Sequence, residues 1–160
     1  MEHFFTLFFH FLGLGLLVTV NVAGFVLDSQ YRRAPDLAQK AVILRALKPI
    51  GMISPIAIVL MLLTGIGNMH ALGFGLLDAP GWLAYKIVFF AIAVISGTLL
   101  GMKAMKRGKL VHAMVTGSAP ANAEQLLRGY DRQIRLGQVV MPILLFIIIG
   151  LSIYGRLGYQ

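Results

Sequence analysis

The residues best able to do chemistry in this chain are three basic side chains inside or at the end of apolar segments. His10 interrupts a run that begins at Phe4, His70 ends a second run, and Lys86 follows Trp82 by one helical turn in a third. An ionisable side chain at membrane depth is costly and generally marks a functional site. Neutral imidazole is also a common ligand of haem iron and copper. His10, His70 and Lys86 are therefore the first candidate site.

Two cofactors fit these side chains, and the sequence leaves the choice between them open. His10 could be one axial ligand of a b-type haem, with His70 or Met69 as the other. Lys86 would then pair with a haem propionate. Imidazole and thioether donors also suit copper, whose ligands would be His3, His10, Met69 and His70. If no cofactor is bound, Lys86 only extends its ammonium to the membrane interface and His70 is an interfacial residue.

The elements that must position these side chains are four apolar runs long enough to cross a bilayer. A spanning helix needs about 20 mostly apolar residues, and the runs cover residues 4–27, 50–72, 82–102 and 136–154. The composition agrees, since 58% of the residues are hydrophobic and only 12% are charged, against roughly 25% charged in soluble domains. We therefore expect one domain over residues 1–160, an all-α four-helix membrane bundle.

Positive charge orients this bundle. Twelve of the fourteen Lys and Arg residues lie in two segments, 29–50 and 103–135. By the positive-inside rule both face the cytoplasm, and both termini and the loop at 72–81 lie on the other side, together with the candidate site. This pattern predicts a multi-pass protein of a bacterial-type cytoplasmic membrane. The charges flank apolar runs and do not line a soluble face, so the net charge of +8 indicates anionic lipids as partners and no nucleic acid.

The two basic segments are expected to contain amphipathic helices. Helical spacing of apolar residues predicts a helix over 36–48 that continues into the second run. Asn122 and Gln125 are typical of a capping box, so another helix should start there and continue into the fourth run. Residues 108–121 are expected to be a flexible link between these parts.

Three arginines share one face of that second amphipathic helix. Arg128, Arg132 and Arg135 lie at positions i, i+4 and i+7, a spacing that places them side by side. They would either clamp a phosphate or lipid headgroup or form a solvated face that anchors the helix at the membrane.

Other features limit the chemistry. The chain has no cysteine, which excludes disulfides, thiolate metal sites, iron–sulfur clusters and covalent c-type haem. The predicted spans carry no acidic residue deep enough to relay protons. We expect Asn21, near the end of the first span, to bond across to another helix.

Short motifs in the first three runs carry a resemblance to known proteins. They are His10 with Gly13, then Leu62-Leu63-Thr64-Gly65, and Gly81-Trp82-Leu83-x-x-Lys86. They look like a superfamily of small four-helix membrane proteins that includes the HemJ type of protoporphyrinogen oxidase, the membrane domain of CopD copper-resistance proteins and related uncharacterised families. The resemblance covers about the first 105 residues. It implies a haem- or copper-handling role in which His10 and Lys86 are site residues.

This resemblance leaves several functions open, and the third run departs from it, since no histidine follows Lys86 within the run. HemJ-type proteins usually have a histidine between the Trp and the Lys, where this chain has Ala84 and Tyr85, so a sister family fits better. We expect a redox-type membrane protein that holds a b-type haem or a metal in the non-cytoplasmic leaflet. The alternatives are a non-catalytic subunit or assembly factor of a larger membrane complex, and a copper-handling or transport protein. The partner would be another membrane protein or a second copy of this chain in a homo-oligomer. The sequence does not decide whether the protein is an enzyme.

Overall fold

Four long helices make up this protein. The computed structural model describes residues 2–75 and 79–158. The helices are α1 (Glu2–Arg33), α2 (Leu37–Ala71), α3 (Gly81–Val115) and α4 (Ala123–Gly158). Each contains a window long and apolar enough to cross a membrane. The expected all-α four-helix fold is confirmed, and the chain is a multi-pass membrane protein.

The helices are longer than a bilayer requires. With 32 to 36 residues each, they are about 48–54 Å long at about 1.5 Å per residue. The hydrocarbon core of a bilayer is only about 30 Å thick. The bundle therefore extends beyond the membrane, and its ends can carry charge.

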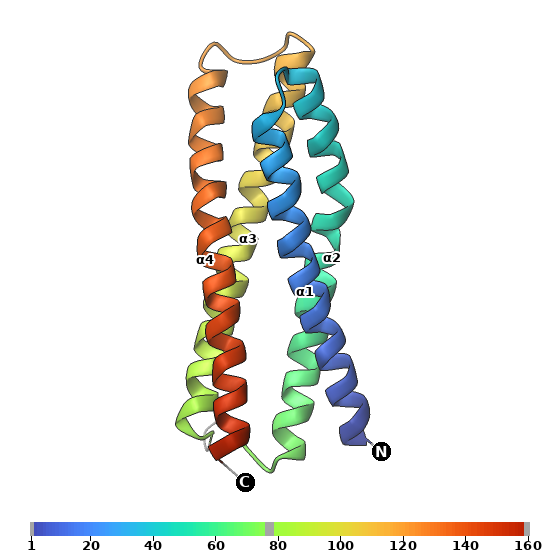
Figure 1. Cartoon of the computed structure of the whole chain (residues 1–160), viewed down its shortest axis with the longest axis vertical. Coiled ribbons are helices and arrows are strands. Elements are labelled where there is room, and N and C mark those ends of the chain that lie inside the picture. Colours follow the sequence, from blue (N-terminus) through green and yellow to red (C-terminus); the bar gives the residue numbers. More distant parts are fainter. Residues whose placement is uncertain (1, 76–78, 159–160) are drawn as a thin grey trace.

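The helices are arranged as two antiparallel hairpins, α1–α2 and α3–α4 (Figure 1). The connections at 34–36 and 116–122 meet at one end of the molecule, drawn at the top of Figure 1, which we call the basic end. The chain ends and the α2–α3 connection lie at the opposite end, which we call the termini end. Each helix contacts its hairpin partner more extensively than it contacts the other hairpin, and α2 with α3 provides most of the contact between hairpins.

Local sequence explains where the helices begin and end. The side chain of Asp36 accepts a hydrogen bond from the backbone N–H of Gln39 at 2.8 Å and caps α2. Two residues after the last residue of α2 and of α3 lies a glycine of positive φ (+74° in both), Gly73 and Gly117. In both cases the glycine N–H and the next N–H bond back to carbonyls of the last turn, the arrangement known as a Schellman motif.

The structure confirms two of the predicted helices and corrects one predicted loop. The helix over 36–48 runs without a break into the second apolar run, and α4 begins directly after Asn122. The flexible link predicted at 108–121 is wrong, because α3 continues to Val115 and only 116–122 connects the two helices. The reason is tertiary packing, which the local signal of Gly108 and the small residues does not include.

That packing is a hydrophobic cluster at the basic end. Tyr31, Val111 and Leu127 are buried together and come from α1, α3 and α4. α2 contributes Ala41 and Leu44 to the same cluster. All four helices therefore share one core at this end, which holds the two hairpins together.

The apolar halves of the helices are organised differently. Ala93, Leu144 and Ile148 form a buried cluster between α3 and α4. In total, only 11–17% of each apolar window is buried inside the bundle. Most large apolar side chains thus face outward, as expected for a surface whose solvent is lipid.

Small residues allow close approach within each hairpin. A Cβ atom added at Gly13 of α1 would lie 3.0 Å from Met61 Cγ of α2, and one added at Gly155 of α4 would lie 2.5 Å from the Trp82 ring of α3. Glycines of this kind let helix backbones approach closely where no hydrophobic effect drives association.

Candidate functional site

His10 lies on the face of α1 that contacts α2. Its Nδ1 is 2.9 Å from Oγ1 of Thr64, which is buried in the hairpin. Thr64 Oγ1 in turn donates its hydrogen to the carbonyl oxygen of Leu60 at 2.6 Å. A hydroxyl has only one hydrogen to give, so in the His10–Thr64 bond the imidazole Nδ1–H is the donor.

This hydrogen bond determines which nitrogen of His10 carries the lone pair. In a neutral imidazole with its hydrogen on Nδ1, the lone pair is on Nε2. Gly65, the neighbour of Thr64, lies against the same ring, since a Cβ atom there would be 3.8 Å from Cε1 of His10. Two residues of the Leu-Leu-Thr-Gly motif therefore hold the ring of His10.

The face of α2 that holds His10 continues toward the termini end with another polar group. Asn68 lies one turn beyond Thr64, and its side-chain Oδ1 is buried without a hydrogen-bond partner among the residues described. The oxygen and nitrogen of a side-chain amide are assigned from their partners, so either could face this position. A buried side-chain oxygen without a hydrogen-bond partner is uncommon, and it can accept a hydrogen bond from a bound group.

The other predicted site residues occupy the same half of the bundle in different environments. His70, in the last turn of α2, is exposed, Met69 is partly buried, and Lys86 is partly buried in the second turn of α3. The side chain of His3 lies outside the described residues. Residues 2–75 and 79–158 contain no group of three or more His, Cys, Asp or Glu side chains that could hold a metal ion.

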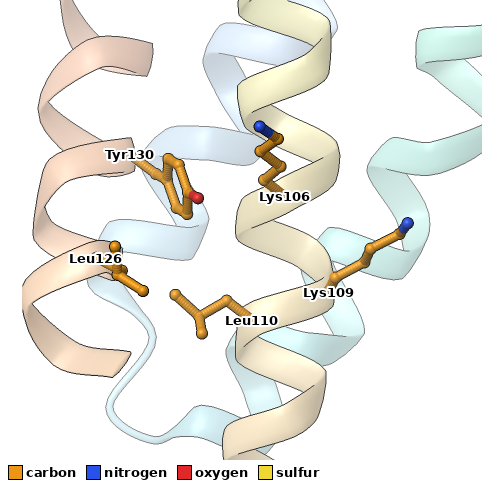
Figure 2. A pocket seen from close by; sticks show the side chains of 5 residues that line it. All are labelled: Lys106, Lys109, Leu110, Leu126 and Tyr130. Carbon is orange, nitrogen blue, oxygen red and sulfur yellow. The ribbon is translucent and has the colours of Figure 1, made fainter. Parts of the chain in front are cut away.

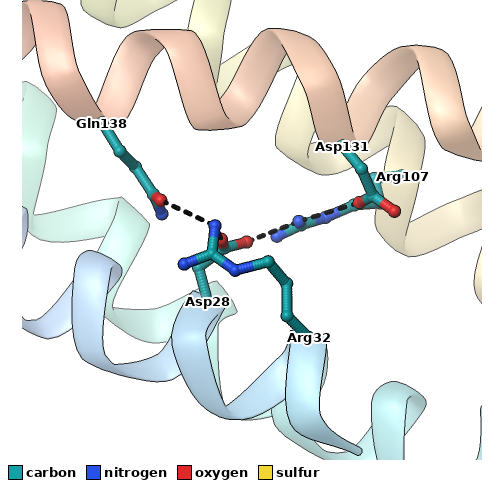
Figure 3. Close-up of polar contacts among 5 residues, drawn as sticks. All are labelled: Asp28, Arg32, Arg107, Asp131 and Gln138. Carbon is teal, nitrogen blue, oxygen red and sulfur yellow. Dashed lines mark hydrogen bonds and ion pairs between the residues drawn. The ribbon is translucent and has the colours of Figure 1, made fainter.

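The structure also contains a site that the sequence did not predict, a buried charge cluster near the basic end (Figure 3). Arg107 of α3 bonds through Nη1 to Asp28 Oδ1 of α1 at 2.5 Å and to Asp131 Oδ1 of α4 at 3.2 Å. Arg32 Nη1 lies 2.8 Å from Asp28 Oδ2 and 3.3 Å from Oε1 of Gln138. We call these five residues the charge cluster, and they join three of the four helices.

Tyr31 covers the charge cluster from the side of the hydrophobic core. Its ring centroid is 4.3 Å from the guanidinium carbon of Arg107, a cation–π distance. Tyr31 and Arg107 are only 1% and 2% exposed. The hydroxyl of Tyr31 and Nε of Arg107 have no hydrogen-bond partner in the described part of the chain. The guanidinium is thus desolvated and compensated mainly by two carboxylates.

A weak sequence signal for the charge cluster exists. The chain has only six acidic residues against fourteen Lys and Arg, so an aspartate within a helix beside such an excess has many possible partners. The interpretation of Arg107 as an orientation signal alone missed its pairing. Asp131 was overlooked because it lies among the arginines of α4, whereas its side chain pairs with Arg107 of α3.

The row of arginines itself is exposed. Arg128, Arg132 and Arg135 all lie on the outer face of α4, and Arg128 is 3.7 Å from Glu124 in an exposed ion pair. The expectation for Asn21 is wrong, because its Nδ2 donates to the carbonyl of Leu17 in its own helix at 2.8 Å. The i−4 carbonyl is always within reach of a side-chain donor of this length, so Asn21 does not need another helix.

Comparison with known proteins adds nothing to this geometry, since no protein-family model, no curated protein and no solved structure matches the chain.

Proposed function

We propose that this protein is a redox-type integral membrane protein that binds a b-type haem through His10 in the termini-end half of the bundle. The observation that carries the proposal is the hydrogen-bond chain from His10 Nδ1 through Thr64 Oγ1 to the carbonyl of Leu60. It orients the imidazole and directs the lone pair to Nε2. Histidines that bind metals almost always donate their other ring N–H to such an acceptor, which fixes the tautomer and the ring orientation.

Haem accounts for the side chains better than a bare metal ion. A porphyrin supplies four nitrogen ligands itself, so one or two protein ligands are sufficient. Met69 or His70 would be the second axial ligand, and Lys86 would pair with a propionate. The buried amide of Asn68 would meet the edge of the bound group. When bound, the haem would supply one-electron redox chemistry, and the protein would set its position and surroundings.

The distribution of charge supports an orientation for this site. Twelve of the fourteen Lys and Arg residues belong to the basic end, so this end faces the cytoplasm in our proposal, as the positive-inside rule requires. The haem is then in the non-cytoplasmic leaflet of a bacterial-type inner membrane. The exposed arginines of α4 contact anionic lipids on the cytoplasmic side.

The experiment is a visible spectrum of the protein purified in detergent after expression with added haem, oxidised and then reduced with dithionite. We expect a Soret band that shifts on reduction. His10→Ala should abolish it, whereas His112→Ala should leave it unchanged, because His112 is exposed at the opposite end of the bundle. The comparison therefore separates a specific axial ligand from adventitious binding to any histidine.

Two outcomes would refute the haem proposal. One is a colourless wild-type protein despite the added haem, and the other is a Soret band that survives in His10→Ala. Copper in a metal analysis of the colourless protein would favour the copper-handling alternative. A membrane protein that copurifies in a fixed ratio would favour a non-catalytic subunit or assembly factor.

A further inference from the structure

A groove of about 280 Å³ lies between α3 and α4 near the basic end. Its lining consists of Lys106, Lys109, Leu110, Leu126 and Tyr130 (Figure 2). Leu110 and Leu126 point toward each other across the groove, on the side nearer the 116–122 connection. Lys106 and Tyr130 line the other side of the groove from α3 and α4, and the Lys109 side chain points away from Tyr130. The groove is thus apolar on the side of Leu110 and Leu126 and carries the cation of Lys106 on the other side.

The positive charge of this groove is not neutralised by nearby acids. The two closest acidic residues of α4 are engaged elsewhere, since Asp131 bonds to Arg107 and Glu124 is in an ion pair with Arg128. Within the described residues, Lys106 and Lys109 make no ion pair at 4.0 Å or less. A third cation, Lys103 Nζ, lies 5.9 Å from the ring centroid of Tyr130.

The groove lies at the depth of lipid headgroups. The apolar run of α3 ends at Met102, so Lys106 is about 6 Å and Lys109 about 10 Å further along the helix axis. Headgroups occupy about 5–8 Å on each side of the hydrocarbon core. Lys106 is nearer to this apolar run than Leu110 is, so the cationic side of the groove is the side toward the bilayer, where a lysine ammonium can reach a lipid headgroup.

We propose that this groove is a binding site for the phosphate of an anionic phospholipid. Lys106 donates to the phosphate together with the hydroxyl of Tyr130, and Lys103 adds positive charge. Lys109 joins by rotating its flexible stem. This site is distinct from the exposed arginines of α4, because its lining residues come from two helices, α3 and α4. It is independent of haem binding at the termini end.

The experiment is native mass spectrometry of the detergent-purified protein titrated with phosphatidylglycerol or with phosphatidylcholine. We expect the wild-type protein to retain phosphatidylglycerol preferentially. The variant Lys106→Gln/Lys109→Gln should reduce that affinity about twenty-five-fold, the product of about five-fold for each lysine near an anionic lipid. The matched control is Arg45→Gln/Lys48→Gln, which removes two exposed cations from α2 at the same end and should change the affinity less than three-fold.

Each other result would overturn the proposal. Equal retention of the two lipids would show that the groove does not recognise an anionic headgroup. An equal loss in both double variants would show a non-specific charge effect. Inorganic phosphate that displaces phosphatidylglycerol at equal concentration would show that the ligand is free phosphate and not a lipid. Circular dichroism of both variants, expected to match the wild type, establishes that they are folded.

Discussion

Removing the guanidinium of Arg107 tests whether the charge cluster holds the two hairpins together. In Arg107→Met, the aspartate on α1 loses its closest partner while its side chain remains only 4% exposed. Breaking a buried ion pair from one side costs about 3–5 kcal/mol, because a charge is left without compensation. Arg32 still lies 2.8 Å from that aspartate, and Asp131 is 29% exposed and can be hydrated. We therefore expect Arg107→Met to lower the free energy of unfolding by the smaller of these values, about 3 kcal/mol.

The assay is reversible unfolding by SDS in mixed micelles, followed by circular dichroism. Arg128→Met is the matched control, because its ion pair partners are 74% and 79% exposed and such pairs contribute about 0–1 kcal/mol. The double variant Asp28→Leu/Arg107→Met should recover to within about 1 kcal/mol of the wild type, since no buried charge remains unpaired. Equal losses in Arg107→Met and Arg128→Met, or a double variant as unstable as Arg107→Met, would refute this reasoning.

Three further predictions concern backbone contacts and the histidine. Gly155→Ala should lower the free energy of unfolding by about 1–3 kcal/mol, because its Cβ would lie 2.5 Å from the rigid indole ring of Trp82. Gly150→Ala, with open space around the added Cβ, should raise it by up to about 1 kcal/mol. Equal effects of the two variants in SDS unfolding would contradict this packing. Thr64→Val should lower the free energy of unfolding by about 1–3 kcal/mol in the same assay, because it leaves the Nδ1–H of His10 without an acceptor. Thr64→Ser keeps the hydroxyl and should leave this free energy unchanged. Gly117→Ala should lower stability by about 1–2 kcal/mol because of the positive φ, and an unchanged unfolding midpoint would contradict that strain.

The four helices and the early starts of α2 and α4 follow from the sequence, but the length of α3 does not. An apolar run predicts where a helix must lie in lipid, and it ends where charges begin. The third run ends at residue 102, while α3 continues to Val115. The added turns are helical because Leu110 and Val111 pack on the core shared by all four helices. Periodicity within one segment contains no information about that partner surface.

The surroundings of His10 and the charge cluster also differ in how far the sequence predicts them. The depth of His10 and the small residues near it in the motif are visible in the sequence, and the structure places Thr64 and Gly65 against its ring. The pairing of Asp28 with Arg107 joins residues 79 positions apart. Nothing local distinguishes this arginine from its exposed neighbours, because its burial depends on how α3 lies against α1. The Asp28–Arg107 pair is therefore known only from the three-dimensional structure.

The order of helices along the chain has a consequence for how the protein is made. Each hairpin pairs helices that are neighbours in sequence, so α1 and α2 can enter the bilayer before α3 is synthesised. Arg107 is synthesised 79 residues after Asp28, about 4–16 s later at about 5–20 residues per second. During this interval Arg32, one turn away from Asp28 on the same helix, is its available counter-charge. The i,i+4 ion pair, which persists in the folded protein, therefore allows Asp28 to be paired at each stage of synthesis.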